Sequence, residues 1–323
     1  MSTKMNFSDL FRVMVLLIFT MSFIACSSQN GENGHEESQP RVFFTSDISS
    51  EGLLSVYQAL GVTPTGNVAV KIHSGEPGNP HYLKPDLIKE LVQIVNGTLV
   101  ETNVAYPSRR ANTASHLIVA EEHGFTEIAP FVILDAIDDL VFPIENGKHL
   151  SENRVGGHFA DFDFHIVLSH FKGHQMGGFG GAVKNVAIGY ASAQGKRVIH
   201  SAGRSGGNIW DTEQEDFLES MAEATKTITD NTKDRILYIN VMNHLSIDCD
   251  CNGNPSRPQM ADIGILASLD PIALDKACVD LVYAATDGAA LIQRMETMKA
   301  IRTLEYAEKL CIGKLEYVLV NID

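Results

Sequence analysis

The sequence has few of the residues on which several classes of protein depend. Its 323 residues include only 25 Lys and Arg against 40 Asp and Glu, a formal net charge of −15. Nucleic-acid binding needs a clustered basic surface, so this balance excludes a nucleic-acid partner. Five cysteines are too few for a disulfide scaffold of this length. With 44% hydrophobic and 20% charged residues, the composition fits neither a disordered protein nor a multi-span membrane protein.

Motifs that would identify a common cofactor site are also missing. The sequence contains no C-x-x-C pair and no ferredoxin cysteine run, which are the patterns of common zinc and iron–sulfur sites. The phosphate-binding registers G-x-x-x-x-G-K-[ST] and G-x-G-x-x-G are absent as well. Residues 41–323 show neither an internal repeat nor a long linker, which indicates a single domain.

The first 40 residues differ in character from the rest. Val13–Ala25 is an almost uninterrupted apolar run, too short to span a bilayer but suited to a signal peptide. It ends at Cys26 in a pattern that resembles a bacterial lipobox, whereas an ordinary secretory signal or a buried helix are the alternatives. We therefore expect a lipoprotein signal peptide over 1–25 and a flexible tether over 26–40. The protein would be an exported bacterial lipoprotein, anchored through lipid on Cys26 at the periplasmic or cell-surface face of a membrane.

From residue 41 onward, strand-like runs alternate with helical runs. The predicted strands are 41–46, 67–73, 98–103, 131–135, 140–144, 163–169, 235–242, 263–268 and 317–322. The predicted helices are 51–60, 86–95, 111–123, 182–188, 217–228, 271–284 and 289–306. Strands that are apolar on both faces and separated by helices indicate a parallel sheet covered on both sides. We predict an α/β fold with a mostly parallel sheet and helices on both faces, in one compact domain of two lobes.

The segment from His165 to His200 carries the densest set of reactive side chains. A predicted strand delivers His170 to its carboxyl end, and His174 follows four residues later. The glycine-rich run 177–181 then leads into a helix with Lys184 in its first turn. Glycines allow a ligand to approach the backbone, and a helix N-terminus favours an anion, although tight packing alone is the alternative. Imidazole and lysine side chains beside such a site favour proton transfer, metal ligation or anion binding.

Two other loops follow predicted strands. His73 ends the strand over 67–73 and Glu76 follows it, and the pair Arg109-Arg110 follows the strand over 98–103. Ligands of open α/β sheets bind at the carboxyl ends of the strands, so we expect these side chains to face the same site. A lone histidine at a strand end is also often a hydrogen-bonded structural residue, and this alternative stays open.

A fourth patch contains the sequence Cys249-Asp250-Cys251. Thiolate and carboxylate groups, with a histidine nearby, are ligands that borderline metals favour. Two cysteines do not close a structural zinc site, so metal or redox use competes with a disulfide between them or with plain thiols. We expect Cys278 and Cys311 to lie in the core.

In this order, the motifs resemble the uncharacterised Fe-S center proteins of domain-of-unknown-function family 362. The resemblance rests on VAVKIHSGEPGN, LSHFKGHQMGGFGGAVKN, NHLSIDCDC and DIGILASLDPIALDKA, and it implies the family's domain over 41–323. Members of that family typically carry a ferredoxin-like insertion after the position of His200. Here the interval 201–210 has no cysteine, so an iron–sulfur cluster is not expected.

A more distant resemblance is to the lactate racemase family. His174, the glycine run and Lys184 are similar to its H-x-x-x-G-x-x-G-G-x-K pattern, with the second glycine pair one place early at Gly180-Gly181. The resemblance implies Lys184 as the anchor of a nickel-pincer nucleotide, His174 as an acid or base and His200 as a metal ligand. A chain exported unfolded does not readily carry a covalent cofactor made in the cytosol, which argues against literal conservation of that chemistry.

These expectations assign a role to each candidate residue. Those expected to act in catalysis are His73, Glu76, His174 and Lys184. Expected cofactor contacts are Arg109, Gly177, Gly178, Gly180, Gly181 and Lys184, and expected metal ligands are His170, His200, Cys249 and Cys251. We predict an enzyme that uses a divalent transition metal or a nucleotide-type cofactor for redox or proton-transfer chemistry on a small anionic substrate. The alternatives are a lipoprotein that binds an anion or metal without turnover, and a family member that kept the fold after losing its redox module.

Overall fold

The computed structural model describes residues 38–206 and 211–323. Ser38–Asp323 group as one compact unit, so the two expected lobes belong to one body. The predicted signal peptide, Cys26 and most of the predicted tether lie outside the described residues. No helix in the described part of the chain is both long and apolar enough to cross a membrane.

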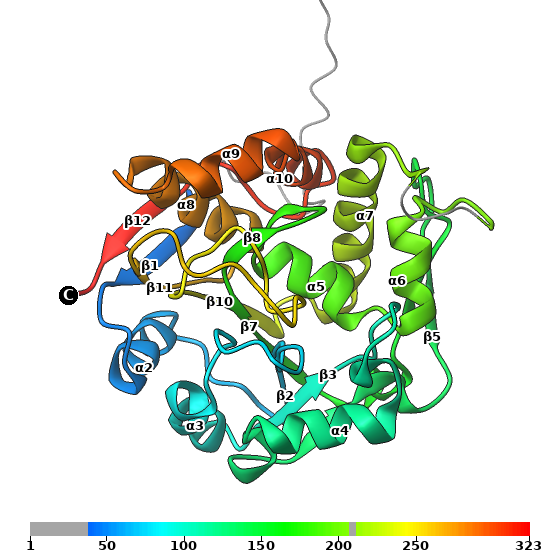
Figure 1. The fold of residues 1–323 in the computed structure, drawn as a ribbon, viewed down its shortest axis with the longest axis horizontal. Helices are drawn as coiled ribbons and strands as arrows, with labels where there is room; N and C mark the ends of the chain where they lie inside the picture. The colour runs from blue at the N-terminus through cyan, green and yellow to red at the C-terminus, as the bar shows by residue number, and fades with distance from the viewer. Residues whose placement is uncertain (1–37, 207–210) are drawn as a thin grey trace, which may run out of the picture. The chain divides into compact units, whose positions relative to one another are not determined.

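The centre of the fold is an eight-stranded sheet in the order β12-β1-β11-β10-β7-β2-β3-β4 (Figure 1). Its strands are β1 (Arg41–Thr45), β2 (Val68–Lys71), β3 (Thr98–Glu101), β4 (Phe131–Ile133), β7 (Phe164–His170), β10 (Ile236–Met242), β11 (Gly264–Ser268) and β12 (Val318–Asn321). Strand β11 is antiparallel to both neighbours, and every other pairing in this sheet is parallel. The prediction of a mostly parallel α/β sheet is confirmed.

Helices cover both faces of the sheet. They are α2 (Ser50–Ala59), α3 (Pro85–Ile94), α4 (Thr113–Glu122), α5 (Ala182–Tyr190), α6 (Ala193–His200), α7 (Gln214–Thr232), α8 (Pro271–Ala284), α9 (Ala289–Thr297) and α10 (Ile301–Lys309). Val167 of β7 packs in a core shared with α5, α7 and α8, whereas its neighbours Ile166 and Leu168 pack in a second core with α2 and α3. This alternation explains why apolar residues occur on both faces of β7 and not on one face alone.

Four features depart from the predicted elements, and one cysteine departs from its expected place in the core. Helix α6 was not predicted, and the helix predicted over 289–306 is divided into α9 and α10 near Lys299, whose φ of +51° interrupts the helix. The glycine-rich stretch forms a small antiparallel hairpin of β8 (Lys172–His174) and β9 (Gly178–Gly180), and a second hairpin pairs β5 (Leu140–Pro143) with β6 (Glu152–Val155). Cys278 is buried as expected, but Cys311 is exposed.

Candidate functional site

A cavity of about 350 Å³ opens at the carboxyl ends of β2, β3 and β7. Helices α5 and α6 and the loop that contains Cys249 and Cys251 complete its wall. The lining histidines are His73, His170, His174 and His200, and the lining carboxylates are Glu101 and Asp250. The histidine-bearing loops therefore converge at the predicted edge of the sheet, as is usual for ligand sites in open α/β sheets.

Three lysines line the cavity without a carboxylate partner among the described residues. Lys71 donates to the carbonyl of its neighbour Ile72 at 2.6 Å and to Asn185 Oδ1 at 3.0 Å. Lys196 donates to the Ala191 carbonyl at 2.7 Å and to the hydroxyl of Thr102. Lys184, in the first turn of α5, forms no hydrogen bond or ion pair with any described residue. The cavity therefore holds positive charge that the surrounding chain does not neutralise.

Burial among like charges makes these lysines unusually acidic. Desolvation, with the nearby Arg110, lowers the pKa of Lys184 to about 8. Desolvation also lowers the pKa of Lys71 to about 8, and the pKa of Lys196 to about 7 with a contribution from the charge on Lys71. An anion among the three would favour their protonated forms, because an opposite charge stabilises the charged state. Around neutral pH these side chains can therefore either hold an anion or exchange a proton with it.

Arg110 is the centre of a buried ionic cluster on one wall of the cavity. Its side chain is 1% exposed and donates to Glu101 at 2.7 Å and to Glu76 at 3.1 Å. Its Nε donates to His116 Nε2 at 3.1 Å. Burial by itself would raise the pKa of Glu101, but the Arg110 guanidinium and His116 hold that pKa well below its usual range. The charge of Arg110 is therefore compensated by carboxylates inside the fold, whereas the charge of Lys184 is not paired with any described carboxylate.

Two sequence predictions in this region need correction. Glu76 does not line the cavity, and its carboxylate accepts hydrogen bonds from Tyr106 at 2.7 Å, Ser108 at 2.6 Å and Arg110. We therefore assign Glu76 a positioning role rather than a catalytic one. Arg109 lies outside the cavity, where it pairs with Glu122 at 2.7 Å on the surface. Of these two neighbours, Arg110 is the one that lines the cavity.

His174 and His200 present opposite hydrogen-bonding groups to the cavity. The Nδ1 atom of His174 accepts the backbone N–H of Gly177 at 2.8 Å and of Met176 at 3.2 Å, so the neutral ring keeps its proton on Nε2. The Nδ1 atom of His200 lies 2.6 Å from the Lys196 carbonyl, which can only accept, so Nε2 is left with a lone pair. Burial lowers the pKa of His200 to about 4 and that of His174 well below its ordinary value. Both rings are therefore neutral at neutral pH, one as a donor and the other as an acceptor.

The hydrogen bonds of His73 and His170 indicate roles other than the predicted catalysis and metal ligation. His170 Nδ1 lies 2.7 Å from Asp250 and its Nε2 lies 2.8 Å from the Asn243 carbonyl, so both nitrogens face oxygen acceptors. A metal ligand needs a free imidazole lone pair, so the prediction of His170 as a ligand is wrong for this arrangement. His73 lines the cavity between the Gly75 N–H and the Arg110 guanidinium, each at 3.1 Å. This environment matches the structural alternative for His73 better than a catalytic role.

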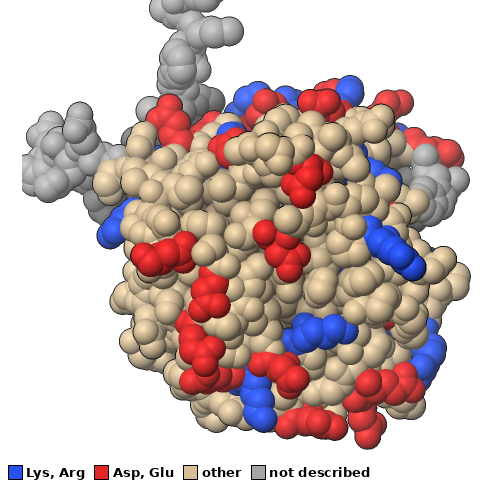
Figure 2. All heavy atoms as spheres, turned by 60° about the vertical axis from the view of Figure 1, so that its left-hand side comes forward, with Lys and Arg blue, Asp and Glu red and all other residues tan. Residues whose placement is uncertain are grey.

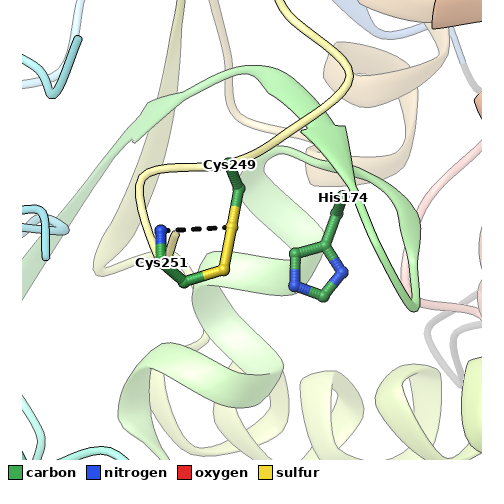
Figure 3. A group of neighbouring side chains, drawn as sticks. All are labelled: His174, Cys249 and Cys251. Atoms are coloured by element: carbon green, nitrogen blue, oxygen red, sulfur yellow. Dashed lines mark hydrogen bonds between the residues drawn. A yellow bond between two sulfur atoms is a disulfide. The ribbon is translucent and has the colours of Figure 1, made fainter. Parts of the chain in front are cut away.

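The predicted metal centre was tested on its donor atoms. One ligand atom from each of His174, Cys249 and Cys251 lies within 4.8 Å of the others, as a metal cluster would require (Figure 3). The two sulfurs are joined in a disulfide, however, and His174 keeps a proton on Nε2. Of the predicted metal ligands, all of them in the described residues, His200 alone offers an available lone pair. In this oxidised form the donor set does not fit a metal ion, which needs thiolates and unprotonated imidazole nitrogens.

The glycine-rich run contributes less to ligand binding than predicted. The first amides of α5, on Ala182 and Val183, donate to the buried carboxylate of Asp275 at 2.7 and 2.9 Å. The helix N-terminus is therefore satisfied from inside the chain. Gly177 and Gly178 do not line the cavity, which corrects two of the predicted cofactor contacts, whereas Gly180 and Gly181 do line it. At Gly178, with φ +78°, a Cβ would lie 2.4 Å from the Ala300 Cβ, so this glycine allows close packing.

We expect Gly181→Ala to lower the free energy of unfolding by about 2 kcal/mol or more. A Cβ at position 181 would lie 2.3 Å from Asp275 Oδ1 and would displace the carboxylate that caps α5. The matched control is Gly180→Ala, whose Cβ would meet only the flexible Lys184 side chain at 3.3 Å. Urea unfolding followed by circular dichroism compares the two variants, and equal losses would contradict this account of Gly181.

Comparisons with known proteins find a family model and solved structures to which this chain is similar. The model of the family described as "Domain of unknown function (DUF362)" matches residues 68–280. No curated protein matches the chain. The lactate racemase apoprotein from Thermoanaerobacterium thermosaccharolyticum aligns at 15% identity and a TM-score of 0.42, covering 76% of this chain and 57% of that one. A protein from Thermotoga maritima aligns at 13% identity and a TM-score of 0.39, covering 80% of this chain and 58% of that one. This chain thus spans little more than half the length of either.

Proposed function

Because this chain belongs to the DUF362 family, whose description assigns no function, we propose a function from the chemistry of its own cavity. The cavity binds a small anion, His200 accepts a proton from that anion, and His174 stabilises the resulting charge through its N–H. The observation that carries the proposal is Lys184, a cation that lines the cavity with no partner among the described residues. The protein would then be an enzyme that acts on a small anionic substrate.

The balance of charge around the cavity supports an anion in particular. The two lining carboxylates are already paired with cations, Glu101 with Arg110 and Asp250 with Lys172. The lining lysines face only neutral acceptors or none, so the net local charge is positive although the whole chain is acidic. Figure 2 shows how acidic side chains are spread over one outer face, in contrast to this interior. A positive, partly desolvated cavity of about 350 Å³ suits a small anion.

The two imidazoles supply the proton-transfer groups. His200 offers a lone pair that can take a proton from a bound molecule, and His174 offers an N–H that can hydrogen-bond to the negative charge left behind. The nearby Lys184, with a pKa of about 8, is a second candidate base. Acid and base side chains with shifted pKa values in one cavity are typical of catalytic sites. Proton transfer by these groups would distinguish an enzyme from a protein that only binds its ligand.

Deuterium exchange distinguishes the two alternatives. The full chain is incubated in deuterated water with small carboxylates and phosphate esters, and proton NMR follows loss of each C–H signal. Exchange that His174→Gln and His200→Gln both abolish would support proton transfer at these rings. A ligand that binds and is recovered without exchange would instead favour a binding protein, the non-catalytic alternative.

We expect anion affinity to fall at least about tenfold between about pH 6.5 and pH 8.5. Lys196, with a pKa of about 7, and Lys71 and Lys184, with pKa values of about 8, lose their protons as the pH rises through this range. A bound anion raises these pKa values, so binding takes up protons. Calorimetric titrations in two buffers with different ionisation enthalpies measure this uptake. Affinity that does not change with pH would contradict a role for these lysines.

We also propose that the protein is anchored through lipid on Cys26 after export. The support is the sequence alone: an apolar run of signal-peptide length that ends in a lipobox-like Cys26, followed by a polar tether. In cells given a labelled fatty acid, the full chain should acquire the label and fractionate with membranes. Cys26→Ala should abolish both, and label retained in that variant would contradict the anchor.

A further inference from the structure

The disulfide between Cys249 and Cys251 forms part of the wall of the proposed anion site. Both cysteines are partly exposed and line the cavity, so a small molecule bound there can reach the sulfurs. The two sulfurs and one nitrogen of His174 lie within 4.8 Å of one another. A disulfide that only stabilises the fold would not need to be accessible from a cavity that also contains unpaired lysines and an imidazole.

One of the two sulfurs accepts a hydrogen bond, and further donors lie in the same cavity. The backbone N–H of Cys251 donates to Cys249 Sγ at 3.2 Å (Figure 3). Figure 3 also shows the His174 ring with one nitrogen turned toward the disulfide. Since Nδ1 of His174 accepts two backbone amides, the nitrogen on this side is Nε2, which carries the proton. A negative charge that forms on Cys249 would therefore be met by the amide, with the imidazole N–H and Lys184 in the same cavity.

We propose that the Cys249–Cys251 disulfide is a redox centre that exchanges two electrons with a small anionic thiol bound in the cavity. This inference rests on the proposed anion binding and names the substrate class for it. The thiol is held through its carboxylate or sulfonate by the cavity lysines, with its sulfur toward the disulfide. In the opposite direction, the reduced cysteine pair would reduce the disulfide of the same small thiol.

The exchange proceeds in two balanced steps. The ligand thiolate attacks Cys251 Sγ, a sulfur–sulfur bond forms between them, and the bond to Cys249 breaks with its electron pair left on Cys249. A second ligand thiolate then attacks the ligand sulfur of the mixed disulfide and releases Cys251 as a thiolate. Two ligand thiols become one ligand disulfide, and the two cysteine thiolates take up protons from solvent. Cys251 is the sulfur attacked because Cys249 is the better-stabilised leaving group.

The test compares thiols of different charge. Full chain is treated with mercaptoacetate, neutral 2-mercaptoethanol or cationic cysteamine, and free cysteines are alkylated at timed intervals. Mass spectrometry of the peptide that contains Cys249 and Cys251 gives each rate, which separates this disulfide from the other cysteines. The same chain in concentrated urea supplies the intrinsic reactivity of each thiol. We expect folding to raise the mercaptoacetate-to-cysteamine rate ratio at least about tenfold, through electrostatic attraction in the cavity.

Variants locate the effect. Lys184→Met should lower the folded-state ratio by about tenfold, whereas Lys226→Met, a change on the outer surface of α7, should leave it unchanged. Rapid alkylation of the intermediate should find mercaptoacetate on Cys251 and the alkylating group on Cys249. The reverse labelling would overturn the assignment of Cys251 as the sulfur attacked.

The outcomes separate this inference from the proposed function. Equal rate ratios in folded and unfolded chain, or a disulfide that no thiol reduces unless the chain unfolds, would overturn the redox centre. If small carboxylates without a thiol still bind in calorimetry, the anion site stands and only the redox proposal fails. If those carboxylates do not bind either, the proposed anion site is wrong, and the redox proposal that rests on it is wrong as well.

Discussion

Replacing Arg110 with methionine is expected to lower the free energy of unfolding by about 3 to 5 kcal/mol. The substitution leaves Glu76 and Glu101 beside each other in the interior without the guanidinium that joins them, at 3.1 and 2.7 Å. Glu101 is 2% exposed, so water cannot replace the lost charge. Removing one partner of a buried ion pair is far more destabilising than removing both, because a buried charge stays uncompensated.

The matched control is the adjacent residue. Arg109 forms a two-point ion pair with Glu122, but both side chains are nearly half exposed on the surface. We expect Arg109→Met to change the free energy of unfolding by no more than about 0.5 kcal/mol, as is usual for an exposed pair. Urea denaturation of both variants, with thermal unfolding if the Arg110 variant is too unstable, measures the difference. Similar losses of unfolding free energy at the two positions would contradict the claim that Arg110 stabilises the protein through the buried cluster.

Lys184→Met is expected to have opposite effects on binding and on stability. Loss of a charged hydrogen bond to the anion should weaken binding by about tenfold to a hundredfold. Loss of an unpaired, partly buried ammonium should raise the free energy of unfolding without anion by about 1 kcal/mol. The lowered pKa of Lys184, about 8, has the same origin, since desolvation disfavours its charged form. A substitution that stabilises the fold but removes binding is typical of a functional residue.

The two effects are measured on one preparation. Calorimetry gives the affinity, and thermal unfolding with and without anion gives the stability and its dependence on ligand. Lys226→Met is the control, since Lys226 lies outside the cavity and pairs with Asp230 on the outer surface of α7. Unchanged anion affinity in the Lys184 variant, or a lower free energy of unfolding instead of a higher one, would contradict the proposed role of Lys184 in anion binding.

Most of the fold could be predicted because its strands and helices carry their own signals. Strands such as β7 and β10 are mostly apolar and are buried along almost their whole length, as expected of strands covered on both faces. Helix α6 was missed because it is short and contains Gly195. Its one local signal is Ser192, the N-cap residue that accepts the Gly195 N–H at 3.0 Å. The break near Lys299 depends on packing between helices and has no such signal.

The site could be predicted in part. The location and the histidine-bearing loops followed from the strand ends. Lys71 was not predicted, although a lysine at the end of an otherwise apolar strand is a signal in the sequence. The choice between Arg109 and Arg110 depends on which side chain turns inward, and local sequence does not encode this. The hydrogen bond between His170 and Asp250 joins residues 80 positions apart, so its effect on ligation required the folded structure.

The most direct test of the anion site is a calorimetric titration of the full chain with matched charged and uncharged ligands. Lactate and its amide, lactamide, have the same shape and differ in charge; phosphate and oxalate extend the series. At about pH 6.5, where the lysines are largely protonated, we expect saturable binding of at least one anion, weakened by added salt, and no binding of lactamide. Equal affinity for lactate and lactamide, or no binding of any anion in the series, would contradict the account.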